Sequence, residues 1–440
     1  MLLFVLFSKG LFGVPGSVSR IIQLLVLIGL TMRIFKKLIL SKSHSLMMPN
    51  FVSPIYIYLI GYFLLLIFSG VVGYFVGNYD LPWSQQENFT GSKLNSFINS
   101  VAIRPLFEYV VAAYFIIYFV FLPRLFLKTK KDLVYFFTIF KIMFIVSLLA
   151  GILDYFFSSM GFVDLIPRHI YDGVDIGNRY HGFGGEPRQA FVYLMLGLAI
   201  FHLKAYFEGT SLNKWWAFFI IIAAILTKSF SGYLGIFAFI GLSIVSQLKS
   251  LKSFFIALFY SSILLLFLYL LMINTEKIIL YLESASNLWA ILETGGELPY
   301  LMKVQRDSIY PLYDLTVKFR EFNFFPIFFG SGLGSASVTN NVYDGVVLGV
   351  FNPNSQFVRL LYASGLFGFL FFLLAFTHPV KYLTKNLDRR TQNHFILYML
   401  LLVGCSFGVR SPAPYIYLGV FISVMSLSGQ NSQLLKHKEK

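Results

Sequence analysis

The sequence predicts an all-α fold, a polytopic transmembrane helical bundle of about twelve helices with a large outer loop before the tenth helix. The first observation is composition, because 57% of the 440 residues are hydrophobic and 12% are charged, about half the charged share of a soluble protein. The second is length, since apolar runs of about 20 residues can cross a bilayer core. The third is continuity: the run from Ser262 to Ile273 lacks the alternation that a membrane β-barrel requires.

Charged or Gly/Pro-rich breaks separate the apolar runs and set the bounds of each predicted helix. The first run is short and contains Lys9, so whether residues 2–14 span the bilayer stays open. The predicted helices lie at residues 2–14, 20–35, 53–77, 105–123, 133–157, 188–203, 215–227, 231–248, 253–273, 355–377, 393–409 and 412–428.

These helices divide the chain into three parts. Residues 1–273 form an N-terminal bundle of nine helices, which includes a short outer segment at 158–187. Residues 274–354 form the large outer loop, in which helical spacing of apolar and charged residues predicts amphipathic helices at the membrane interface. Residues 355–440 form the last three helices and a basic tail. Outer segments this long are usually functional.

The basic residues predict the orientation of the bundle. Alternate loops and the C-terminal tail contain 19 of the 35 Lys and Arg residues but only 4 of the 20 acidic ones. The net charge of +15 therefore lies on one side, which the positive-inside rule makes cytoplasmic. A basic soluble protein would suggest nucleic acid, but here topology explains the charge and we expect no nucleic-acid partner. Both termini are predicted to be cytoplasmic if the first span is real.

Several kinds of chemistry are excluded. A single cysteine, Cys405, leaves no internal disulfide, thiolate zinc site or iron–sulfur cluster. Only His169 and His181 lie on the predicted outer side, and no zinc-protease or serine-hydrolase motif is present. The glycine run at 330–334 does not follow a predicted strand or end in Gly-Lys-Ser/Thr, so it indicates a turn and not a nucleotide loop. We expect no cofactor and no metal.

A polar cluster stands in the first outer segment. Arg179, His181 and Arg188 bring cations next to a helix start at Pro187, where backbone N–H groups favour an anion. Glu186 is the one candidate base, although an acidic residue before proline also fits an ordinary first helical turn. Each cation would also serve as an interfacial anchor, but their clustering favours a binding site.

Further candidates come from other outer segments and helix ends. Lys228 lies in Thr227–Gly232, which we interpret as a helical hairpin turn with capping hydroxyls. In the alternative interpretation, Lys228 faces an anionic headgroup. Arg359 lies about one turn inside a membrane helix, where a charge is costly and usually functional. Arg410 would line the same cavity or extend to the interface. The remaining candidates in the large loop are Arg306, Arg320 and Asn354.

These residues describe an outward-facing cavity rich in arginine. Arg binds phosphate oxygens through two parallel hydrogen bonds, so such a cavity suits a lipid-linked phosphate or pyrophosphate. A transporter or flippase would instead need charged residues along both halves of the bundle and a water path between its two sides. The polar residues gather on the outer side, which favours chemistry there.

At these positions the chain resembles the bacterial O-antigen polymerase and ligase superfamily. Three stretches carry the resemblance in the expected order and together span about 165–375. The first is Arg179-x-x-Gly182-x-x-x-Glu186-Pro187, and the second is Leu226-Thr-Lys-Ser229-Phe-Ser231-Gly232. The third is Phe328-Phe-Gly330-Ser-Gly332-Leu-Gly334, followed by Asn354-Ser-Gln-Phe and Ser364-Gly365-Leu-Phe-Gly368.

The resemblance implies a metal-independent, inverting glycosyltransferase in the bacterial inner membrane, whose large loop before the tenth helix is periplasmic. Its substrate would be an oligosaccharide on undecaprenyl pyrophosphate, and its partners would include membrane lipid, a chain-length regulator and a flippase. Catalytic roles fall to Arg179, Glu186 and Arg320. Substrate-binding roles fall to His181, Arg188, Lys228, Arg306, Asn354, Arg359 and Arg410.

Two positions depart from the family pattern. Members often have Arg after the hairpin Ser, where this chain has Phe230. Ligases typically have His before the Asn that corresponds to Asn354, and Pro353 stands there. The second departure favours a polymerase of repeat units over an O-antigen ligase that acts on lipid A-core, and both remain open.

Overall fold

In the part of the chain that the computed structural model describes, the fold is all-helical apart from one minimal strand pair. Strands β1 (Val342–Tyr343) and β2 (Val346–Val347) pair antiparallel. The described residues are 28–29, 32, 54–75, 103–162, 166, 179–182, 187–229, 324–330, 332–333, 342–343, 346–347, 356–405 and 411–438. The helices are α3 (Ile57–Phe75), α6 (Ile103–Phe115), η2 (Ile116–Phe121), α7 (Leu122–Phe126), α8 (Lys130–Ser159), α9 (Pro187–Glu208), α10 (Lys214–Leu226), α16 (Phe324–Phe329), α17 (Gln356–Leu383), α18 (Arg389–Cys405) and α19 (Ala413–Lys438).

Each of these helices except α16 coincides with a helix predicted from an apolar run. The segment predicted at 105–123 consists of α6, η2 and α7 in direct succession. The predicted spans at 2–14, 231–248 and 253–273 lie outside the described residues, as do most residues of the span at 20–35.

The chain is a membrane protein. Within the described part, four helices are long and apolar enough to cross a bilayer: Glu108–Phe126, Lys130–Ser159, Pro187–Glu208 and Arg359–Leu383. Large apolar side chains on α8, including Ile142, Val146, Leu149 and Leu153, are exposed, as lipid contact requires. Three further helices are apolar but shorter: Ile57–Gly73, Lys214–Leu226 and Ala413–Ser428.

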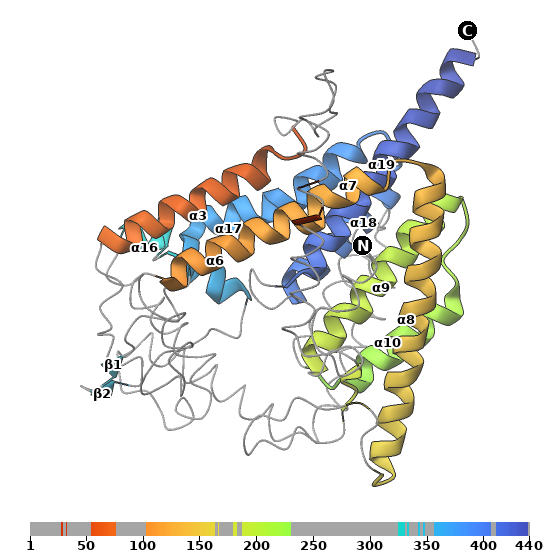
Figure 1. Ribbon diagram of the computed structural model, residues 1–440, viewed down its shortest axis with the longest axis horizontal. Coiled ribbons are helices and arrows are strands. Elements are labelled where there is room, and N and C mark those ends of the chain that lie inside the picture. The colour runs from red at the N-terminus through yellow and green to blue at the C-terminus, as the bar shows by residue number, and fades with distance from the viewer. Residues whose placement is uncertain are drawn as a thin grey trace, which may run out of the picture.

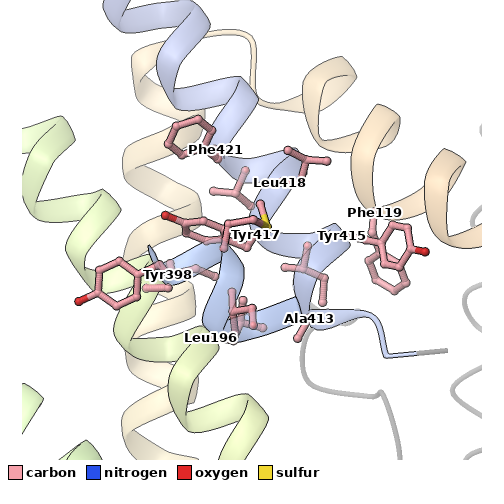
Figure 2. Close-up of a cluster of buried hydrophobic side chains, with 14 of the residues drawn as sticks. Phe119, Leu196, Tyr398, Ala413, Tyr415, Tyr417, Leu418 and Phe421 are labelled. Atoms are coloured by element: carbon pink, nitrogen blue, oxygen red, sulfur yellow. The ribbon is translucent and has the colours of Figure 1, made fainter. Parts of the chain in front are cut away.

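Helix α19 lies at the centre of the bundle. Every residue from Ala413 to Met425 is buried, because α19 packs against α9, η2, α7, α17 and α18. Tyr415, Tyr417, Leu418 and Phe421 extend from α19 toward several neighbouring helices (Figure 2). A helix that is apolar all round belongs in the interior of a bundle, and the first four turns of α19 fit that description.

A local irregularity allows α19 to approach its neighbours closely. The six residues of η2 form a π-helical turn, and Pro123, in the first turn of α7, supplies no N–H for a helical hydrogen bond. A Cβ atom at Gly419 would lie 2.0 Å from the Phe119 carbonyl oxygen and 2.9 Å from Pro123 Cγ. Only glycine therefore fits where α19 crosses η2.

Most charged residues in the described part lie at one end of the helices, which we call the basic end. Figure 1 shows the α7–α8 junction, the end of α9 and the α17–α18 junction on the side toward which α19 projects. Arg124 Nη1 donates a hydrogen bond of 2.8 Å to Tyr56 Oη and so ties α7 to the segment before α3. Basic residues at this end include Arg124, Lys128, Lys130, Lys131, Lys204, Lys381, Lys385, Arg389 and Arg390.

Candidate functional site

A first polar cluster lies at the end of the helices opposite the basic end, and it is built around Asp154, near the end of α8. Asp154 Oδ1 accepts a hydrogen bond of 2.9 Å from the Ile166 backbone N–H. Its other oxygen, Oδ2, lies 3.1 Å from His181 Nε2, and both side chains are almost fully buried, at 2% and 4% exposed. The contact is an ion pair without the alignment of a hydrogen bond. One carboxylate thus contacts two points of the connection between α8 and α9.

The imidazole of His181 faces oxygen atoms on both sides. His181 Nδ1 lies 3.1 Å from the Gly182 carbonyl oxygen, while Nε2 faces Asp154. Both ring nitrogens therefore face oxygen atoms of groups that only accept hydrogen bonds.

Tyr180 connects this cluster to the turn that follows α10. Its backbone N–H donates a hydrogen bond of 2.9 Å to the Leu226 carbonyl, and its ring lies against Gly151 of α8, where any Cβ would be 2.7 Å from the ring. Burial, together with the charge of Asp154, raises the pKa of the Tyr180 hydroxyl. The first two stretches of the family resemblance, distant in the sequence, therefore touch at this hydrogen bond.

The turn after α10 is held by its own hydroxyl group. Thr227 Oγ1 donates to the Ala224 carbonyl at 2.6 Å and accepts from the Ser229 backbone N–H at 3.4 Å. Lys228 has a positive φ of 49° and an exposed side chain. The structure thus has a turn where the sequence predicted one, and it directs Lys228 outward.

The third stretch packs backbone to backbone on α17. Helix α17 is broken at Gly365, which has φ 63° and ψ −166°. At this break the Ala363 carbonyl accepts a hydrogen bond of 3.0 Å from the Gly332 backbone N–H. A Cβ on Gly330 would lie 2.4 Å from Ser364 N, and one on Gly365 would lie 2.4 Å from the Phe328 carbonyl carbon. Glycine is required on both sides of this contact.

Three of the predicted arginines fall within the described residues. Arg179, Arg188 and Arg359 are all half-buried. Arg188 lies in the first turn of α9 and interacts electrostatically with the Cys405 thiol at the end of α18. Arg359 precedes the break of α17 by six residues. Figure 1 shows the starts of α9 and α17 on the side away from the basic end.

The other predicted site residues lie outside the described residues. These are Glu186, Arg306, Arg320, Asn354 and Arg410. Around the described candidates, no three side chains of His, Cys, Asp or Glu in the described part of the chain come close enough together to hold a metal ion.

Sequence reasoning missed the residue around which the first cluster is built. Asp154 is the one charged residue between Lys141 and the end of α8, and an acidic side chain inside an apolar helix is usually paired or functional. That signal was available in the sequence. The identity of its partners was not, because His181 is 27 positions away. Glu108 of α6 is a second buried acid that the same signal would have found.

Comparison with known proteins adds no further information about these residues. No family model, no curated protein and no solved structure matches the chain.

Proposed function

We propose that this membrane protein is a metal-independent, inverting glycosyltransferase that polymerises polysaccharide repeat units. It would transfer glycan from undecaprenyl pyrophosphate to an acceptor sugar at the periplasmic face of the bacterial inner membrane. The full fold would be the bundle of about twelve helices, with both termini in the cytoplasm and the basic end facing inward. Its product would be O-antigen, capsule or exopolysaccharide.

One observation carries this proposal: the two cation-bearing stretches of the family resemblance meet at the end opposite the basic end. The hydrogen bond from Tyr180 to Leu226 places Arg179 next to the turn that contains Lys228. The third stretch supports the same reading, because its glycines pack on the break at Gly365 that follows Arg359. A half-buried arginine at a helix end suits the phosphates of a lipid-linked donor.

The proposed reaction is a displacement at the anomeric carbon of the donor. An acceptor hydroxyl oxygen forms the new bond to that carbon, while the bond to the pyrophosphate oxygen breaks and leaves its electron pair on undecaprenyl pyrophosphate. Arg179, with Arg306 or Arg320, would stabilise the charge that develops there. Glu186 would accept the proton of the hydroxyl. The leaving group is already good, so the arginines should matter more than the base.

The direct test uses purified protein in liposomes with a lipid-linked repeat unit and no nucleotide sugar. We expect a ladder of polymer, with the rate lowered about 100-fold or more by Arg179→Ala, as when one charge-stabilising donor is removed. Arg389→Ala, an exposed arginine of the basic end, is the matched control and should remain active. Normal polymer from Arg179→Ala would contradict the proposal.

A deletion strain separates the alternatives. Single repeat units attached to their acceptor indicate a polymerase, and unattached polymer indicates an O-antigen ligase. Complete absence of surface repeat units would indicate a lipid-linked oligosaccharide flippase.

A further inference from the structure

We propose that Asp154 is a positioning residue that sets the location of Arg179 through His181. This inference rests on the proposed function, because it gives Asp154 a part in donor binding and turnover. Asp154 does not itself contact the substrate in this arrangement. Asp154 is buried among protein groups, and Arg179 is the residue that would contact the substrate.

The geometry makes Asp154 the fixed point of the α8–α9 connection. Its two oxygens hold Ile166 and His181, which are 12 and 27 positions along the chain. Because α8 is a 30-residue helix, its side chains provide a rigid reference for Ile166 and His181. Arg179 lies two residues before His181 on the same stretch of backbone, so we expect a displacement of this backbone at His181 to displace the Arg179 guanidinium as well.

The contacts of Tyr180 also fix the position of the backbone at Arg179. Tyr180, between Arg179 and His181, hydrogen-bonds to Leu226 and packs on Gly151. The backbone on which Arg179 stands is therefore held from α8 and from α10 at once. The contact with α10 constrains one peptide unit, and the ion pair to Asp154 constrains the next side chain. Both constraints are needed to fix the direction of the Arg179 side chain.

Loss of this ion pair should be costly in two ways. Removal of one partner of a buried pair leaves the other side chain without its contact, so the side chain of His181 would move when Asp154 is removed. A displacement of about 1 Å of a group that binds substrate can lower turnover about 100-fold. The expected defect is therefore one of kcat per folded molecule.

The experiment compares kcat and KM of purified Asp154→Ala, His181→Ala and the double variant in the liposome assay. Each single variant should lower kcat about 100-fold with a smaller change in KM. The double variant should have a kcat no lower than that of the more impaired single variant, since both substitutions act through one contact. Asp154→Asn retains an oxygen for Ile166 but not the charge, and its kcat should lie between wild type and Asp154→Ala.

Hydrogen exchange provides a readout that does not depend on activity. The Ile166 amide should exchange faster in Asp154→Ala and stay protected in His181→Ala, whereas the Tyr180 amide should exchange faster in both. Asp132→Ala is the matched control, because Asp132 lies on the same helix at the basic end and forms the capping box with Thr129. It should keep its kcat and leave both amides protected.

The outcomes separate the two proposals. If the wild-type protein polymerises the repeat unit and Asp154→Ala has the same kcat, this inference alone is overturned. Equal loss of kcat in Asp132→Ala also overturns it, since any damage to α8 would then be enough. Wild-type protein without transferase activity overturns the proposed function and this inference with it.

Discussion

Single glycines of this chain are required for two different physical reasons. Gly161 and Gly365 both have positive φ, at 81° and 63°. Around Gly161, however, a Cβ would meet nothing within 4 Å, while at Gly365 it would run into the backbone of Phe328. The first position requires a backbone conformation only, and the second requires conformation and space together.

This contrast gives a stability prediction. Gly161→Ala should lower the free energy of unfolding by about 1–2 kcal/mol, the cost of a left-handed conformation for an L-residue. Gly365→Ala should lose more: about 1–3 kcal/mol because its φ and ψ lie in a region essentially restricted to glycine, and about 1–3 kcal/mol because the contact with Phe328 must be pushed apart. Thermal unfolding in detergent measures both, and equal losses would show that the contact at Gly365 is not close-packed.

A second residue-scale prediction concerns Asp388, which precedes α18. Its Oδ1 accepts a hydrogen bond of 3.0 Å from the Thr391 backbone N–H, as an N-cap does. A hydrogen bond from the Thr391 side chain and, to a smaller extent, the one from the Thr391 backbone N–H hold the pKa of Asp388 below its usual value. Because the folded pKa is depressed, the stabilisation is complete above the unfolded value and is lost as pH falls through the folded one.

Asp388→Ala should therefore lose about 1 kcal/mol of stability near neutral pH and less at acidic pH. Asp388→Asn is the matched control, since asparagine caps as well as aspartate but does not titrate. Melting curves between about pH 5 and pH 3 should show a shallower decline for Asp388→Asn than for wild type. Parallel curves would contradict the role of this carboxylate.

At the scale of helices, the sequence predicted spans better than their ends. Residues 133–157 were predicted as one helix, and α8 runs from Lys130 to Ser159, because the capping box of Thr129 and Asp132 extends its start. Helix α17 continues through Pro379 to Leu383, whereas the prediction stopped at 377. Apolar run length is a local property, but caps and tolerated prolines depend on neighbours.

The candidate site was less predictable than the spans. Clusters of Arg and Gly were visible in the sequence, yet the break at Gly365 was not, since residues 355–377 were predicted as a continuous helix. That break exists because Gly332 supplies an N–H to the Ala363 carbonyl from outside the helix. The pairing of Asp154 with His181 is likewise tertiary, and no local pattern indicates it.

The crossing of α19 over η2 gives a prediction for a helix pair. Gly419→Ala places a methyl group against the Phe119 carbonyl and should destabilise the protein by about 1–3 kcal/mol. Ser428→Ala, further along α19, removes a hydroxyl that bonds only within its own helix and should change stability by less than about 0.5 kcal/mol. Comparable losses in the two variants would show that α19 and η2 are not in close contact.

For the whole molecule, the distribution of charge makes the orientation testable. Fusions after Leu387 and after Lys438, both at the basic end, should give a fluorescent protein that folds only in the cytoplasm. Fusion after Gly161, at the opposite end of α8, should give active alkaline phosphatase, which folds only outside. The reverse pattern would place Arg179 in the cytoplasm and would contradict a periplasmic reaction.

The central position of α19 also has a consequence in time. Its partners α9 and η2 leave the ribosome long before Ala413 is made: about 200 residues separate the end of α9 from α19, or roughly 10–40 seconds of synthesis. During this interval α9 and η2 are present in the bilayer without α19, the helix that packs between them. The packing of these helices around α19 is therefore a late step of assembly, and quality-control proteases have their best opportunity just before it.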